Sequence, residues 1–265
     1  MTGASIDLVL DIGNTRTKAA LSRNGRMLRW TSLPNGEVAA LGAWVGADRP
    51  DAVAVGSVAA EDSQVISFLD QWASPLIVTG QTATPLRMGY TTPGSLGVDR
   101  LANAVAAAAR FPGRLAMVID LGTCITYDLV SASGEYLGGA ITPGERMRAS
   151  AMHGYAARLP LAEPGDHPPT IGTSTLDALA AGVHHGIVYE LQGFIRSYTH
   201  EAPDPVVILT GGDAVRFARR SKSGIFALPL LTLEGLQVIL QHSRTGLGRP
   251  VDNPAEGSDG PSPAG

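Results

Sequence analysis

The sequence predicts an α/β protein built from two copies of one unit, each a mixed five-stranded sheet with flanking helices. An apolar strand that ends in Asp-x-Gly and returns as a strand with hydroxyl side chains occurs at residues 7–18 and again at residues 115–128. After each of these hairpins, the apolar spacing predicts a third strand and then helices that alternate with strands. With 265 residues and 44% hydrophobic side chains, the chain can bury the core that such a fold needs.

The first half of the chain, residues 1–112, is expected to form the N-terminal domain. Its first hairpin and a third strand form a β-meander, and shorter helices and strands alternate after it; the expected elements are strands 26–33, 52–56 and 76–78 and helices 37–45 and 62–72. Residues 80–97 form a polar loop with Gly and Pro, and loops of this length in compact domains are often functional. The loop leads into a helix that begins at Val98 and stops near Phe111.

The second half, residues 113–249, is expected to repeat this pattern as the C-terminal domain. Pro143 is placed at a helix start, and Ser174 or Thr175 is the expected N-cap of a long helix that continues to Ile195. The other expected elements are strands 115–121, 124–131, 135–141, 206–209 and 225–228 and a last helix at 231–241. Residues 250–265 lack apolar periodicity and are predicted to be a disordered tail.

The turn of the first hairpin has the residue types that hold a phosphate chain. Gly13 lets backbone and ligand approach closely, and Asn14, Thr15 and Thr17 offer side-chain donors beside successive backbone N–H groups. Lys18 could add a positive charge, and Asp11 could hold a divalent cation directly or through water. An ordinary hairpin turn would use the same residue types, but the second copy at residues 115–128 favours a phosphate clamp between the two halves.

Gly97-Val98-Asp99-Arg100 places a carboxylate and a guanidinium side by side at a helix N-terminus. Arg100 can hold a carboxylate with a bidentate pair of hydrogen bonds, and Asp99 could accept the proton of an attacking hydroxyl. The alternative is a capping Asp with a surface Arg in the first turn. The residues alone leave both interpretations open.

Composition excludes some classes of function. A net charge of −4 argues against a protein that mainly grips a nucleic-acid backbone, and no nucleic-acid partner is expected. The single cysteine, Cys124, excludes an internal disulfide and suits a reducing compartment. No stretch approaches the roughly 18 apolar residues of a membrane helix, and the N-terminus lacks the pattern of a signal peptide, so a cytoplasmic protein without membrane contact is expected.

The hairpins and the Gly97–Arg100 motif together resemble the signatures of type III pantothenate kinases. The matching segments, in order and spacing, are Asp11-Ile12-Gly13-Asn14-Thr15, Gly97-Val98-Asp99-Arg100 with Asn103, and Asp120-Leu121-Gly122-Thr123-Cys124-Ile125-Thr126. Residues 138–144 and the region of Thr175 also match, so that the resemblance extends to about residue 249. The repeated pattern likewise resembles the duplicated ribonuclease-H-like domains of the actin-like ATPase superfamily, which includes acetate and sugar kinases and Hsp70.

The resemblance implies ATP-dependent phosphorylation of pantothenate to 4′-phosphopantothenate, the first step of coenzyme A synthesis. By position, it implies that Asp99 accepts the proton and that Asp120 binds a monovalent cation, potassium or ammonium. ATP would be bound with Mg²⁺, and the implied ATP contacts are Asp11, Ile12, Gly13, Asn14, Thr15, Arg16, Thr17, Lys18 and Thr123. The implied pantothenate contacts are Tyr90, Gly97, Val98, Asp99, Arg100 and Thr175. The family is dimeric and its Thr175 equivalent reaches across the interface, so a homodimer is implied.

The sequence departs from the family pattern at two positions, and two other functions are compatible with parts of it. Cys124 stands where the family usually has Ala, and Ser174 where it usually has Asn. Another phosphotransferase of the same superfamily would also carry Asp-Gly hairpins, although the Gly97–Arg100 motif argues against it. A non-catalytic accessory factor for transcription would find support only in a basic cluster at Arg216, Arg219, Arg220 and Lys222.

Overall fold

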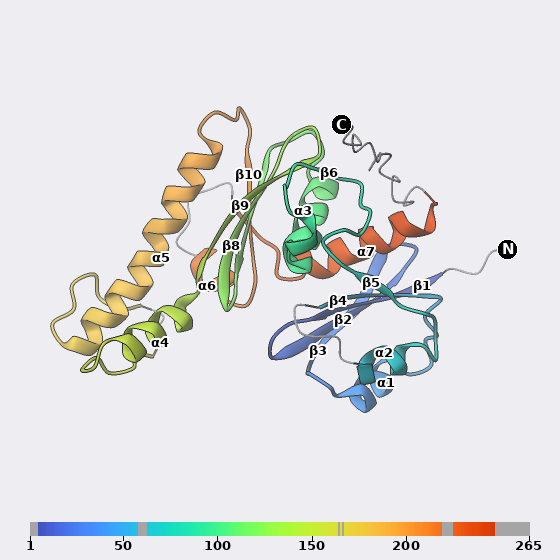
Figure 1. The fold of residues 1–265 in the computed structure, drawn as a ribbon, viewed down its shortest axis with the longest axis horizontal. Coiled ribbons are helices and arrows are strands. Elements are labelled where there is room, and N and C mark those ends of the chain that lie inside the picture. The colour runs from blue at the N-terminus through green and yellow to red at the C-terminus, as the bar shows by residue number, and fades with distance from the viewer. Residues whose placement is uncertain (1–4, 58–62, 164, 166, 219–224, 247–265) are drawn as a thin grey trace, which may run out of the picture.

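A computed structural model describes residues 5–57, 63–163, 165, 167–218 and 225–246 (Figure 1). The strands of these residues form two sheets, one of five and one of six strands, with helices packed on both (Figure 1). The predicted tail at 250–265 and three residues of the basic cluster, Arg219, Arg220 and Lys222, lie outside the described residues. Within the described part of the chain, no helix has the length and apolar character needed to cross a bilayer.

The first sheet has the strand order β3-β2-β1-β4-β5. β1, β2 and β3 are antiparallel neighbours, and β4 and β5 add to β1 in parallel. β1 is apolar throughout its middle because both faces are covered, with Leu8 and Leu10 toward α1 and α2 and Val9 toward the opposite face. The elements are β1 (Ile6–Ile12), β2 (Arg16–Arg23), β3 (Arg26–Pro34), α1 (Val38–Val45), β4 (Ala52–Ser57), α2 (Ser63–Leu69) and β5 (Leu76–Val78).

The second sheet has the order β11-β10-β7-β8-β9-β6 and repeats the meander of the first. Its sixth strand, β6, comes from the predicted loop at 80–97, pairs with β9 in parallel and is followed by a short 3₁₀ helix, η1. The elements are β6 (Arg87–Met88), η1 (Pro93–Ser95), β7 (Ala116–Leu121), β8 (Cys124–Val130), β9 (Glu135–Pro143), α4 (Glu145–Tyr155), α5 (Thr175–Thr199), β10 (Val206–Thr210), α6 (Ala214–Ala218) and β11 (Ile225–Ala227).

The prediction that Pro143 starts a helix is wrong. Pro143 is the last residue of β9, where it pairs with Cys124, and Gly144 is the N-cap of α4. Gly144 lies against the turn of the second hairpin, because its N–H donates to the Thr123 carbonyl and a Cβ here would stand 2.2 Å from the Gly122 carbonyl oxygen. Because residue 144 makes this contact, the helix begins one residue later, at Glu145.

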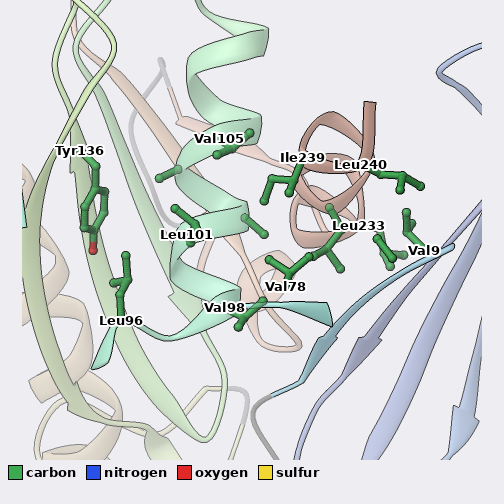
Figure 2. Close-up of a cluster of buried hydrophobic side chains, with 14 of the residues drawn as sticks. Val9, Val78, Leu96, Val98, Leu101, Val105, Tyr136, Leu233, Ile239 and Leu240 are labelled. Atoms are coloured by element: carbon green, nitrogen blue, oxygen red, sulfur yellow. The ribbon is translucent and has the colours of Figure 1, made fainter. Parts of the chain in front are cut away.

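Two helices connect the two sheets. α3 (Val98–Arg110) packs on β7 and β8 of the second sheet, whereas α7 (Leu231–Arg244), from the end of the chain, packs on β1, β2 and β4 of the first. α3 and α7 also pack on each other, and a Cβ at Gly235 would lie only 1.8 Å from the Ala102 carbonyl oxygen. Figure 2 shows their shared core, with Leu101 and Val105 of α3 between Tyr136 on one side and Leu233 and Ile239 of α7 on the other.

Candidate active site

The first hairpin forms a tight turn at the end of β1. The Gly13 N–H donates to the Arg16 carbonyl at 3.1 Å, which leaves Asn14 and Thr15 exposed at the tip. Asp11 is paired with Lys18 across the two strands. Of the predicted phosphate contacts, the turn therefore exposes Asn14 and Thr15, with Asp11 and Lys18 facing each other behind them.

The side chains of Thr17 and Arg16 bond to residues of β3 and the turn after it. The Thr17 hydroxyl donates to Asn35 Oδ1 at 3.0 Å, and Asn35 Nδ2 donates to the Gly13 carbonyl at 2.9 Å. The guanidinium of Arg16 donates to the hydroxyl and the carbonyl of Ser32. Asn35 thus braces the hairpin tip, a role that no sequence motif indicated.

The second hairpin presents Asp120 just before its turn, paired with Thr126, and Thr123 at its exposed tip. Asn103 of α3 donates to Asp120 Oδ2 at 3.0 Å, and Thr232 of α7 donates to Asn103 Oδ1 at 3.0 Å. Gly211, with φ +90°, approaches Asp120 so closely that a Cβ would stand 2.4 Å from Oδ1. One carboxylate is therefore held by the second hairpin, both connecting helices and the end of β10.

Asp11, Asp99 and Asp120 lie close enough to influence one another's charge. Burial raises the pKa of Asp11 to about 6; the charge of Lys18 lowers it, and that of Asp99 raises it further. Burial and then the charge of Asp99 raise the pKa of Asp120 to about 7, and Asp11 contributes in the same direction. The two hairpins and the N-terminus of α3 therefore bring three carboxylates within range of one another's charge.

These carboxylates fit a cation that is shared with a phosphorylated ligand. Among the described residues, no three His, Cys, Asp or Glu side chains stand close enough together to hold a metal ion by themselves. Mg²⁺ in nucleotide sites needs only one or two protein carboxylates, since phosphate oxygens and water complete its octahedron. Asp11, beside the exposed turn, is suited to such a shared ion.

Asp99 lies in the first turn of α3, and its Oδ1 accepts from the Arg100 N–H at 2.8 Å. Gly97 is the N-cap, and a Cβ there would stand 2.5 Å from Asp99 Oδ1, so glycine leaves this carboxylate its space. Val98 is buried, and its side chain packs over Gly56 of β4. Of this motif, Asp99 is the side chain that lies with the other two carboxylates.

Arg100 is buried and paired with a carboxylate that the sequence analysis missed. Its Nε and Nη2 lie 2.8 Å and 2.7 Å from Asp128 Oδ1, which also accepts from the Tyr136 hydroxyl at 2.7 Å. Thr126 donates to Asp128 Oδ2, and the ring of Tyr90 lies 5.8 Å from the Arg100 guanidinium carbon. The predicted substrate contacts Tyr90 and Arg100 are therefore brought together, and Asp128 orients the guanidinium.

A cavity of about 550 Å³ adjoins the second hairpin. In its wall, Glu145 pairs with Arg216, and the buried His184, which does not line the cavity, has Nδ1 3.5 Å from Glu145 Oε1. The cavity is lined by Gly122, Thr123, Glu145, Arg146, Met147, Gly212, Asp213 and Arg216. The sequence analysis had placed only Thr123 of this set at a binding site, although the Gly211-Gly212-Asp213 turn after an apolar strand could have indicated Gly212 and Asp213.

The family model and the sequence relatives agree on one family. Residues 7–197 match the family model described as type III pantothenate kinase. The chain belongs to this family. Type III pantothenate kinases from Bacteroides fragilis and Porphyromonas gingivalis W83 are 38% and 39% identical over 239 and 243 residues; each alignment covers 90% of this chain, and 98% and 99% of the relative.

The family's fold is the duplicated ribonuclease-H-like, actin-like ATPase architecture predicted from the sequence. The activator of 2-hydroxyisocaproyl-CoA dehydratase from Clostridium difficile, solved with bound ADPNP, superposes with a TM-score of 0.53 at 12% identity, over 94% of this chain and all of that one. Component A of (R)-2-hydroxyglutaryl-CoA dehydratase from Acidaminococcus fermentans gives 0.53 at 13% identity, over 92% and 100%.

Thr175, the remaining family position with an implied substrate contact, stands apart from the three carboxylates. It is the first residue of α5, after Ser174, whose hydroxyl accepts from the Asp177 N–H and caps the helix as predicted. Figure 1 shows the N-terminal end of α5 at the far left of the molecule, well away from α3. Within one chain, Thr175 therefore does not share a site with Asp99.

Proposed function

We propose that the protein transfers the γ-phosphoryl group of ATP to the primary hydroxyl of pantothenate, giving 4′-phosphopantothenate in the first step of coenzyme A synthesis. The observation that carries this proposal is membership of the type III pantothenate kinase family, and the mutual influence of the Asp11, Asp99 and Asp120 charges is consistent with a site shared by these residues. Phosphoryl transfer depends mainly on positioning and on neutralising phosphate charge. Membership of the type III pantothenate kinase family supplies the acceptor.

In this proposal the nucleotide occupies the cavity beside the second hairpin and its phosphates reach the first. Thr123 lines the cavity, whereas Asn14, Thr15 and Lys18 would contact the phosphates from the other side. The acceptor oxygen forms a bond to the γ-phosphorus, the bond to the β–γ bridging oxygen breaks, and the hydroxyl proton moves to Asp99. Mg²⁺ bound near Asp11 would neutralise charge on the β- and γ-phosphates.

A monovalent cation is assigned to Asp120 in this proposal. Asn103 occupies Oδ2 of this carboxylate, and its other oxygen, Oδ1, lies against Gly211, which has no side chain to cover it. A potassium or ammonium ion there would hold Asp120 in its charged form, because an adjacent cation lowers a carboxyl pKa. The carboxylate of pantothenate is assigned to Arg100, with Tyr90 beside it.

We also propose that the active form is a homodimer. Large apolar side chains are exposed on β9, α4 and α5, namely Leu137, Ile141, Met147, Leu176 and Tyr189. Burying apolar surface of this kind stabilises subunit association. A dimer would also allow Thr175 of one subunit to complete the pantothenate site of the other.

The test is ATP-dependent phosphorylation of pantothenate by the purified protein with Mg²⁺ and either K⁺ or Na⁺. We expect product with K⁺, little with Na⁺, and a loss of at least 100-fold in kcat for Asp99→Asn, as for other proton-accepting groups. Asp204→Asn, at an exposed carboxylate paired with Arg114, is the matched control and should keep full activity. No product from folded protein that still binds ATP would contradict the proposal and favour another acceptor or a non-catalytic role.

A further inference from the structure

Asn35, in the turn after β3, is bound to both sides of the tip of the first hairpin. Its Nδ2 donates to the Gly13 carbonyl at 2.9 Å, and its Oδ1 accepts from the Thr17 hydroxyl at 3.0 Å. Because a carbonyl oxygen only accepts, the amide nitrogen must face Gly13, and the amide oxygen is left for Thr17. The exposed residues Asn14 and Thr15 lie between these two contacts. One side chain from outside the hairpin therefore holds the turn on both sides.

The two faces of the first sheet carry different residues at this end. Ile12 and Thr17 stand opposite each other in the β1–β2 ladder, and Ile12 packs with residues of α1 and α2. The neighbouring pair, Asp11 and Lys18, lies on the other face, because successive side chains of a strand alternate. That other face packs against α3 and α7. Since Asn35 binds the Thr17 side chain, it lies on the α1 and α2 side, opposite to Asp11 and Lys18.

The direction of the Gly13 carbonyl determines the direction of the next N–H. The Gly13–Asn14 peptide is trans, and in a trans peptide the C=O and the N–H point in opposite directions. Because Asn35 binds the carbonyl from the α1 and α2 side, the Asn14 N–H points toward the side of Asp11 and Lys18. This N–H has no hydrogen-bond partner in the described part of the chain. Exposed backbone N–H groups of this kind bind anions in turns.

We propose that Asn35 is a positioning residue for nucleotide binding, which holds the Gly13 carbonyl so that the Asn14 N–H donates to a terminal phosphate oxygen. The inference rests on the proposed function, in which the β- and γ-phosphates reach the first hairpin. Without Asn35, the Gly13–Asn14 peptide is free to rotate and to turn its carbonyl oxygen, which carries partial negative charge, toward the phosphates. A donor that is already oriented binds more tightly, because less conformational freedom is lost on binding.

NMR of protein labelled with ¹⁵N at asparagine observes the Asn14 N–H directly. The probe is the non-hydrolysable β,γ-imido analogue of ATP with Mg²⁺. We expect it to shift the Asn14 amide resonance with saturation and to leave that of Asn24, whose N–H donates to the Ser5 carbonyl beyond the other end of β2, unchanged. Asn35→Ala should weaken binding of the analogue about fivefold and reduce the Asn14 shift at saturation. Gln71→Ala, which removes an exposed amide that donates to the Phe68 carbonyl, is the matched control and should change neither.

Kinetics and a double-mutant cycle separate positioning from a purely structural role. In Asn35→Ala the KM for ATP should rise about fivefold, whereas kcat and the KM for pantothenate should change less than about twofold. Thr17→Val should weaken the analogue by itself but not further in the Asn35→Ala background, because Thr17 acts through Asn35, and Thr17→Ser should bind as wild type does.

Two results would overturn the inference. One is an Asn14 amide resonance that does not move at a saturating concentration of the analogue, and the other is unchanged affinity in Asn35→Ala. Additive losses in the double variant would overturn the role of Thr17 in orienting Asn35. An Asn14 shift that depends on Asn35, in a protein that forms no phosphorylated pantothenate, would support this inference and contradict the proposed acceptor.

Discussion

Replacing Asp128 with Asn tests whether this carboxylate holds Arg100 in place. Asp128 is fully buried and takes Nε and Nη2 of Arg100 together with the Tyr136 hydroxyl on one oxygen. Asn keeps the shape and an accepting oxygen but removes the charge, which leaves a buried guanidinium uncompensated. Removing one partner of a buried ion pair costs about 3–5 kcal/mol in the free energy of unfolding. Because the Asn oxygen can still accept hydrogen bonds, we expect a loss of about 3 kcal/mol for Asp128→Asn.

The measurement is urea unfolding of wild type and variant at one protein concentration, since dimers gain stability from association. Asp204→Asn is the control, because the exposed pair of Asp204 with Arg114 has a similar 2.8 Å distance and should contribute less than about 1 kcal/mol. The KM for pantothenate should rise in Asp128→Asn because the Arg100 guanidinium is no longer oriented. A loss below about 1 kcal/mol with an unchanged KM would refute the reasoning.

Two further predictions concern Asp120. Gly211→Ala should destabilise the protein by at least about 1 kcal/mol in thermal unfolding, because of its positive φ and the contact with Asp120 Oδ1, whereas Gly212→Ala, which has open space, should not. Asp120 also predicts a pH dependence. Its folded pKa of about 7 exceeds the unfolded value near 3.9, so the folded state holds more protons between these pH values and this contribution to stability falls as pH rises from about 4 to 7. Asp120→Asn should flatten that slope in unfolding experiments without nucleotide; an equally steep slope would assign it to other groups.

The sequence predicted those parts of the fold that depend on neighbouring residues. Both hairpins and the capped start of α5 follow from local alternation, Asp-x-Gly turns and Ser174. The packing of α7 on the first sheet was not predicted, because an amphipathic helix does not reveal which sheet it will cover. The close crossing of α3 and α7 at Gly235 could not be predicted either, because it depends on the position of the Ala102 backbone.

The same limit applies to the candidate site. Asp11, Asp99 and Asp120 could be singled out because each stands in a short motif with glycine beside it. Asp128 could not, since its pairing with Arg100 joins residues 28 positions apart and its strand is otherwise an ordinary apolar one. Long-range pairs of this kind are determined by tertiary packing, and they produce no periodic pattern of residues from which they could be predicted.

The charges of the three carboxylates would couple the binding of a cation to the binding of a nucleotide. Asp11 and Asp120 carry pKa values of about 6 and 7 because burial and neighbouring negative charge oppose their ionisation, and Lys18 offsets this only in part. A nucleotide brings several more negative charges into the same space, so its binding without cations would be opposed by every one of these groups. A cation at Asp11 or Asp120 reverses that balance, because it lowers the carboxyl pKa, expels the proton and attracts the phosphates. If the proposed site binds both ligands, we therefore expect cation binding and nucleotide binding to be thermodynamically linked, with release of the proton from Asp11 or Asp120 linked to both.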